Sequence, residues 1–359
     1  MVKPVAADRR AARRRALAVV AGMAVVVMAT VVALLVGRDG ERSETPPRSE
    51  TTPPAAEPVL PLLGLEGQVM RRAVLAVKID DTERGRPQTG LAEADVVFEE
   101  MVEGGLTRLL AVYHSQDPDT VGPVRSARST DLFILAELGR PLFAWSGANP
   151  TFAAAVEAAD IVDVGMRAAP DAYHRASDRR APYNLYAAPD RLREAAAGDD
   201  AASTPPSSLF SYREADAPLS GPGVGPAVGF RTTGSDDLTV EIEWAWDVPS
   251  ASWLRGQNGT PHVDSDGERV RVANVIVRVT PYRDSGVRDS LGAVVPEAAA
   301  VGEGDAWLLS DGRAQRGRWH KPSPDAPTTY IDADGAPLRL TPGPTWVEVL
   351  PPGTGEVRH

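Results

Sequence analysis

The sequence contains no cysteine. This absence excludes disulfide bonds, zinc–thiolate sites, a thiol nucleophile and a lipid-modified cysteine. Histidine is scarce and scattered, at His114, His174, His262 and His320 inside the chain. There is no His-Glu-x-x-His, no Gly-x-Ser-x-Gly and no phosphate-binding Gly-Lys-Ser/Thr motif. The chain therefore lacks the sequence signatures of the common metalloproteases, serine hydrolases and nucleotide-binding loops.

Basic residues are in short supply beyond residue 37. The 359 residues include 38 Lys and Arg against 49 Asp and Glu, a formal charge of -11. Residues 1–37 hold six of the bases and one of the acids, so the remainder has 32 bases, 48 acids and a charge of -16. Such a surface repels polyanions, and no nucleic-acid partner is expected. Any anion site must be a local cluster of bases.

One long apolar run is present, at residues 16–37. At a rise of about 1.5 Å per residue, it is long enough for a helix to cross the ~30 Å hydrocarbon core of a membrane. The basic segment 1–15 precedes it, which predicts a single-pass plasma-membrane anchor with a cytoplasmic N-terminus and the folded domains outside. The alternative is a cleaved signal peptide and a secreted protein. Residues 38–58, rich in Pro, Glu, Ser and Thr, are expected to form a disordered stalk.

Residues 59–202 show strands that alternate with short helices. The expected strands are apolar runs at 73–79, 96–99, 106–113 and 142–145. A helix is expected to begin at Ser129-Thr130 and end at Gly139, and Asn149-Pro150-Thr151 is expected to begin another. This pattern predicts an α/β domain, a mixed sheet with short helices.

The pattern changes after a Pro-, Gly- and Ser-rich linker, residues 203–226. From 227 to 352 apolar residues alternate with polar ones, as in Leu238 to Trp244. Asp-Gly turns at 266–267, 311–312 and 334–335 separate apolar runs, which is typical of β-hairpins. We expect a mostly β second domain, whose tryptophans belong mainly to its core, and a short tail at 353–359.

Several long motifs resemble a known family. They are KIDDT (78–82), RPQTGLAEADVVFEE (86–100), VEGGLTR (102–108) and GPVRSAR (122–128), followed in the second half by PHVD (261–264), NVIV (274–277) and LRLTPGPTWVEVLP (338–351). They are similar to the YerB-type bacterial lipoproteins, a two-domain family of unknown function. The resemblance implies an extracytoplasmic envelope protein and two YerB-like domains, but no established reaction. Lipoprotein members carry a lipidated cysteine, so here the apolar segment 16–37 takes its place.

Three arginines and a serine within the resembling motifs are the candidate ligand residues. Arg108, Arg125 and Arg128 present planar guanidinium groups, which match phosphate or carboxylate oxygens. Ser126 and the predicted helix N-terminus at Ser129-Thr130 add donors beside them. The predicted site would hold an anionic envelope ligand. The alternative interpretation is that these arginines pair internally with Glu99, Glu100, Glu103 or Asp131 and fix the fold.

The same region is rich in acids. Supporting or metal-binding candidates are Asp80, Asp81, Glu99, Glu100 and Glu103. Such oxygen ligands suit Mg²⁺ or Ca²⁺, and paired carboxylates suit acid–base catalysis, but the spacing matches no calcium loop. No cofactor is predicted beyond such a divalent cation. Further loop candidates are Gly104, Gly105, Asn184 and Tyr186, with the two glycines expected to make a tight turn.

The leading functional hypothesis is a non-enzymatic, membrane-anchored envelope protein that binds an anionic ligand or a protein partner at the arginines. The rival hypothesis is an enzyme on lipid-linked or cell-wall glycans. It rests on a layout similar to that of the LytR-CpsA-Psr ligases, which use Arg, Asp and Mg²⁺, without a shared motif. A third hypothesis is a structural scaffold.

Overall fold

The computed structural model describes residues 58–232, 238–289 and 291–359. The predicted basic segment 1–15 and anchor 16–37, and all but the last residue of the predicted stalk 38–58, lie outside these residues. None of the helices within the described ranges is long and apolar enough to cross a membrane.

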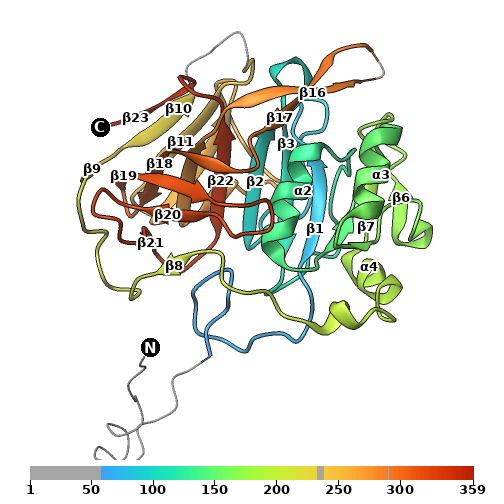
Figure 1. The fold of residues 1–359 in the computed structure, drawn as a ribbon, viewed down its shortest axis with the longest axis horizontal. Coiled ribbons are helices and arrows are strands. Elements are labelled where there is room, and N and C mark those ends of the chain that lie inside the picture. Colours follow the sequence, from blue (N-terminus) through green and yellow to red (C-terminus); the bar gives the residue numbers. More distant parts are fainter. Residues whose placement is uncertain (1–57, 233–237, 290) are drawn as a thin grey trace, which may run out of the picture. The chain divides into compact units, whose positions relative to one another are not determined.

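An 11-stranded mixed sheet forms the centre of the described structure (Figure 1). Its strand order is β20-β19-β18-β15-β22-β2-β3-β1-β4-β5, with β9 beside β19. The strands from the first half of the chain are β1 (Leu75–Asp80), β2 (Val96–Met101), β3 (Thr107–Tyr113), β4 (Leu142–Ala144) and β5 (Val162–Asp163). The later strands are β9 (Val224–Pro226), β15 (Asn274–Val279), β18 (Gly302–Ser310), β19 (Arg313–Lys321), β20 (Thr329–Ile331) and β22 (Thr345–Leu350).

Strand β22 joins the two halves of the chain. It lies between β2 and β15 and runs parallel to both, with Val347 opposite Phe98 on one side and Ile276 on the other. All six of its residues are buried. The predicted domains 59–202 and 227–352 therefore share one sheet, and that sheet is continuous across the predicted linker.

Short helices cover the sheet on both faces. On one face lie α2 (Ser129–Leu135) and α3 (Pro150–Ala158), and on the other lies α4 (Pro189–Ala195). The Asn149 side chain accepts hydrogen bonds from the first amides of α3, which confirms the predicted helix start. Short 3₁₀ turns are η1 (Glu103–Gly105), η2 (Ala136–Leu138), η3 (Pro170–Ala172) and η4 (Asp200–Ser203). The expected mixed sheet with short helices is confirmed.

A 6-stranded antiparallel sheet packs on the face that α4 also covers. Its order is β13-β12-β11-β10-β23, with β14 also on β12. The strands are β10 (Gly229–Thr232), β11 (Ile242–Asp247), β12 (Ser252–Gln257), β13 (Thr260–Pro261), β14 (Arg271–Val272) and β23 (Gly355–Arg358). The predicted alternation is confirmed in β11, because Ile242 and Trp244 are buried on either side of the less buried Glu243. Trp244, Trp253, Trp319 and Trp346 are at most 2% exposed, as expected of core residues.

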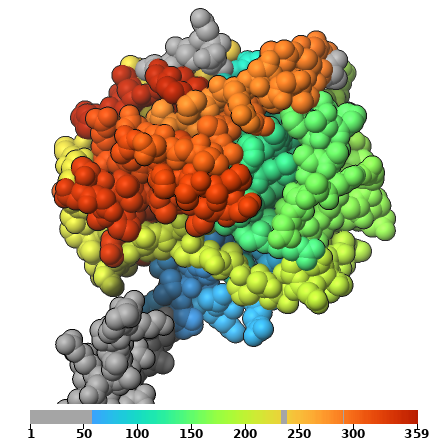
Figure 2. Space-filling view, in the orientation of Figure 1, coloured from blue at the N-terminus to red at the C-terminus, as the bar shows by residue number. Residues whose placement is uncertain are grey.

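Three two-stranded pieces complete the described fold. They are β16 (Tyr282–Arg288) with β17 (Val294–Ala298), β6 (Tyr173–Arg175) with β7 (Leu185–Ala187), and β8 (Ser211–Tyr212) with β21 (Arg339–Leu340). The β16–β17 hairpin lies at the upper right of the view in Figure 2, where it is orange. The predicted Asp311-Gly312 turn joins β18 to β19. Both residues have positive φ, 52° and 65°, as a type I′ hairpin turn requires.

The shared sheet makes the first half of the chain dependent on the last. A chain that ends at Gly343 lacks β22, so β2 and β15 lose a fully buried neighbour, at about 1.5–3 kcal/mol for each large apolar side chain. We expect residues 59–202 to lose their resistance to limited proteolysis in that chain. A chain that ends at Pro352 lacks only the edge strand β23 and should stay resistant. A protease-resistant 59–202 fragment from the shorter chain would contradict a shared core.

Candidate functional site

Strand β2 directs two consecutive acids to opposite faces of the central sheet. Glu99 points toward the 6-stranded sheet and Glu100 toward α2, and neither side chain is exposed. A buried carboxylate costs several kcal/mol unless a cation and hydrogen bonds accompany it. Each face supplies these partners from a different set of elements.

On the face of Glu99, the partner is Arg255 of β12. Its Nη2 atom lies 2.7 Å from Glu99 Oε1 and 2.8 Å from Oε2, and neither residue is exposed. The Trp346 indole also donates to Glu99, at 3.0 Å, and the Arg255 guanidinium lies 5.1 Å from the centre of the Trp346 ring. This cluster links β2, β12 and β22.

Two further carboxyl groups share the cation of Arg255. Asp81 Oδ2 lies 3.3 Å from Arg255 Nη2, and Glu348 stands beside Glu99 in the parallel pairing of β22 with β2. Burial raises the pKa of Asp81 to about 6. Burial and the neighbouring Glu99 raise the pKa of Glu348 well above its usual value. The folded cluster therefore holds protons on Asp81 and Glu348 more tightly than the unfolded chain does.

A neutral histidine closes this cluster toward the solvent. Arg255 Nη1 donates to His262 Nδ1 at 2.6 Å, and His262 Nε2 donates to Gln88 Oε1 at 2.8 Å. Burial and the charge of Arg255 lower the pKa of His262 well below its usual value. Gln88 in turn donates to the Asp81 carboxylate at 3.1 Å.

Sequence reasoning missed Arg255, Gln88, His262 and Glu348. A signal for Arg255 was present, because Trp253, Arg255 and Gln257 alternate with less buried residues in β12. A period of two that begins with a core tryptophan predicts that the arginine also points inward.

On the opposite face, the partner of Glu100 is Lys78. Lys78 Nζ lies 2.6 Å from Glu100 Oε1 and 2.8 Å from Asp131 Oδ1, and none of the three side chains is exposed. Asp131 also accepts from the backbone amide of Arg128, which ties this group to the start of α2. Burial and the charge of Asp131 raise the pKa of Glu100 to about 7.

Two of the predicted ligand arginines form ion pairs with predicted acids. Arg125 Nε lies 2.6 Å from Asp80 Oδ2, and its guanidinium lies 5.6 Å from the centre of the Tyr183 ring. Arg128 donates to both carboxylate oxygens of Glu103, at 2.6 and 2.8 Å. The positive charges of these two arginines are therefore matched by acids within the fold.

Arg108 is arranged differently. It lies on β3 between Asp80 of β1 and Glu100 of β2, is 7% exposed, and forms no ion pair within the described residues. Its Nη1 atom donates to the backbone carbonyl of Ser126 at 2.9 Å. Burial, Arg128 and Arg125 lower the pKa of Arg108 to about 10. The structure thus gathers all three arginines and leaves one without a carboxylate partner.

The remaining predicted residues make local turns, hydrogen bonds and ring contacts. Gly104 and Gly105 have φ values of 71° and 68° in η1, as expected for the predicted tight turn. The Asn184 side chain donates to the carbonyl of Ala176 at 3.2 Å. Tyr186 stacks on His174 with ring centres 5.8 Å apart. Among the described residues, no group of three or more acidic or histidine side chains is arranged to hold a metal ion.

Comparison with known proteins shows the family to which the chain belongs. Residues 62–202 match the N-terminal domain, and residues 235–347 the C-terminal domain, of the protein of unknown function DUF3048. The chain belongs to the DUF3048 family. A relative from Bacillus subtilis (strain 168), named "Putative lipoprotein YerB", is 28% identical over 297 residues, 81% of this chain and 86% of the relative. The crystal structure of YerB protein from Bacillus subtilis has a similar fold, with a TM-score of 0.73 and 24% identity over 84% of this chain and all of that chain.

Removing the positive charge of Arg255 from the protein interior should lower the free energy of unfolding. In Arg255→Leu, the carboxyl groups of Asp81, Glu99 and Glu348 stay buried without it, and breaking such a pair costs about 3–5 kcal/mol. Urea unfolding should show a loss of this size. Arg318→Leu, which removes an exposed pair with Glu303, should cost at most about 1 kcal/mol. Equal losses in the two variants would contradict the central position of Arg255.

The raised pKa of Glu100 gives stability a defined pH dependence. Because the folded state holds this proton more tightly than the unfolded state, the contribution of Glu100 falls as the pH rises from about 4.5 to about 7 and is constant above that. Glu100→Gln keeps the acceptor for Lys78 but cannot titrate. The unfolding free energy of this variant should therefore fall less across that window than in the unaltered protein. The control is Glu157→Gln, which removes one exposed carboxylate by the same substitution.

Proposed function

We propose that this DUF3048 protein is a membrane-anchored, extracytoplasmic protein of the cell envelope that binds an anionic group of an envelope ligand at Arg108. The observation that carries the proposal is a nearly buried guanidinium without a carboxylate partner. An unpaired charge in such a place lowers stability unless a counter-ion joins it. Arg108 offers further N–H donors in the planar arrangement that matches phosphate or carboxylate oxygens.

The neighbouring arginines support this role. Arg125 and Arg128 are held in place by Asp80 and Glu103, and they lie near enough to Arg108 to lower its pKa. Asp80 and Glu103 balance two of these three guanidinium groups, so the charge of Arg108 is the one left without a carboxylate partner. An anion at Arg108 would supply that partner, so its binding energy comes partly from the arrangement of the empty site.

The proposed location rests on two observations. The B. subtilis relative carries the word lipoprotein in its name. This sequence contains no cysteine to accept a lipid, and its apolar run at 16–37 is long enough to anchor it instead. The envelope ligand would then be a phosphate- or carboxylate-bearing wall or lipid-linked component, or an acidic segment of another envelope protein.

Binding is favoured over catalysis because the acids that would do proton transfer are enclosed. Asp81, Glu99 and Glu348 are at most 1% exposed, and each is engaged by Arg255 or by a tryptophan indole. A substrate has no route to these carboxylates in the described conformation. Arg108 keeps a small exposed fraction, 7%.

The proposal predicts opposite effects of Arg108 on binding and on stability. Arg108→Met keeps most of the apolar stem but removes the charge. Pyrophosphate binding by the full chain in detergent, measured by calorimetry, should weaken by about 10- to 100-fold, the size of one or two charge-assisted hydrogen bonds. Without ligand, the melting temperature should stay the same or rise, because like-charge repulsion is removed.

The matched control is Arg167→Met, which removes an exposed positive charge far along the chain and should leave both properties unchanged. A drop in melting temperature with unaltered pyrophosphate binding in Arg108→Met would show a structural role and contradict the proposal. Absence of pyrophosphate and acetate binding by the unaltered protein would contradict it as well.

A further inference from the structure

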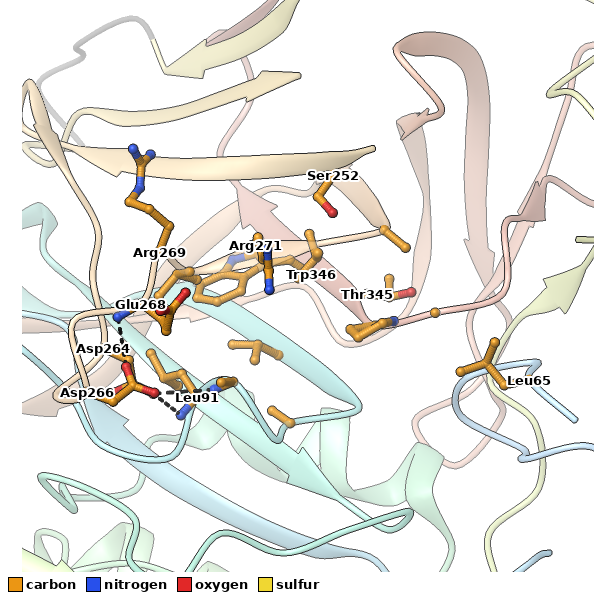
Figure 3. Close-up of a pocket in the computed structure, with 18 of the residues that line it drawn as sticks. Leu65, Leu91, Ser252, Asp264, Asp266, Glu268, Arg269, Arg271, Thr345 and Trp346 are labelled. Atoms are coloured by element: carbon orange, nitrogen blue, oxygen red, sulfur yellow. Dashed lines mark hydrogen bonds between the residues drawn. The ribbon is translucent and has the colours of Figure 1, made fainter. Parts of the chain in front are cut away.

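A cleft of about 450 Å³ opens beside the edge of the 6-stranded sheet, away from the arginine cluster (Figure 3). One wall is β14 and the turn before it, and the opposite wall is the segment 91–97. Residues 342–346, which lead into β22, close one side. Two of these three walls, 91–97 and 342–346, lie in motifs that carry the family resemblance. Most of the lining is apolar, including Leu65, Leu91, Ala94, Val97, Val272 and Trp346.

The β14 wall is the edge of a sheet. Within the described residues β14 pairs with β12 and with no other strand. The Arg255 amide donates to the Val270 carbonyl at 3.0 Å. In an antiparallel pair, alternate residues direct their backbone groups toward and away from the partner. Arg271, the next residue, therefore directs its N–H and C=O away from β12, and it lines the cleft.

The charged groups of the cleft are of both signs. Asp264 is committed to the fold, because its carboxylate accepts from the amide of Leu91 at 2.8 Å (Figure 3) and from that of Ser265 at 2.9 Å. Asp266, Glu268, Arg269 and Arg271 form no ion pair within the described part of the chain. Arg269 donates through Nη2 to the Arg255 carbonyl at 2.9 Å, while its Nε is buried without a hydrogen-bond partner.

We infer that this cleft binds a short extended peptide with an apolar side chain. The exposed edge at Arg271 can exchange two backbone hydrogen bonds with one peptide residue, as in other cases of strand addition. The apolar floor accommodates the side chain, and the volume lies within the usual range for ligand sites. Rim groups of both signs complement a peptide, which carries an ammonium and a carboxylate. A fatty acid or another single-charge amphiphile would leave the acids of the rim without a partner.

The inference is independent of the proposed anion site. Arg108 lies on β3 and reaches the opposite face of the central sheet from the cleft, so a variant at either place leaves the other intact. Failure of pyrophosphate binding at Arg108 and failure of peptide binding at β14 are therefore separate results.

The test is hydrogen–deuterium exchange of the full chain in detergent, with the tripeptide alanyl-leucyl-alanine at about 10 mM, ten times a Kd of 1 mM. We expect slower exchange in the segment 269–273 and a smaller effect with alanyl-aspartyl-alanine. Two variants locate the site. Ala92→Trp fills the mouth of the cleft from an exposed position and should weaken binding by at least tenfold. Arg271→Pro removes the edge N–H and should weaken it similarly, whereas Arg271→Ala keeps that N–H and should retain most of the binding.

Three results would overturn the inference. One is unchanged exchange at 269–273 with the leucyl peptide. Another is protection that Ala92→Trp does not reduce, which would place the peptide elsewhere. The third is equal protection by laurate, which would show an apolar pocket without peptide recognition. If Arg271→Pro fails to fold, the comparison of Ala92→Trp with Arg271→Ala still decides between these outcomes.

Discussion

The buried pair of Arg255 with Glu99 is the interaction on which the rest of this fold depends. It is the point where the 6-stranded sheet meets the central sheet, and its neighbours come from β2, β22, the loop after β1 and His262, which follows β13. One guanidinium stands among three carboxyl groups, so the cluster is balanced only when protons are retained. Such a buried group adds little net stability compared with an apolar core. It favours a single register of the two sheets, because any other register would leave a buried charge without its partner.

The ion pairs of this protein form two groups, one enclosed in the interior and one nearer the surface. Glu100 with Lys78 and Asp131, and Glu99 with Arg255, hold the interior together and are closed to solvent. One step outward, Asp80 and Glu103 position Arg125 and Arg128, and these in turn surround Arg108. The acids that looked like ligand or metal residues thus act mainly on the arginines beside them. The proposed anion site is Arg108, the arginine of this group that has no acidic partner among the described residues.

Local features of this fold follow from the sequence. The apolar runs at 73–79 and 106–113 become β1 and β3 within two residues, the Asn149 cap begins α3, and the Asp311-Gly312 turn joins two strands. The shared sheet could not be predicted from the sequence, because β22 pairs with a strand about 250 positions earlier in the chain, β2, and no local pattern encodes that pairing. The sequence also showed which arginines and acids are close. Which acid each arginine takes depends on where the loop at 122–128 crosses the end of β1, and that is a property of the folded chain.

The position of β22 has a consequence for how this protein is made. Strand β2 is synthesised early, but its neighbour on one side arrives only when the last few dozen residues have been added. Until then, β2 has an open hydrogen-bonding edge on the side that β22 will cover. The growing chain must be kept from pairing with other chains during this interval. The topology therefore ties the completion of the central sheet to the last part of the chain to be synthesised.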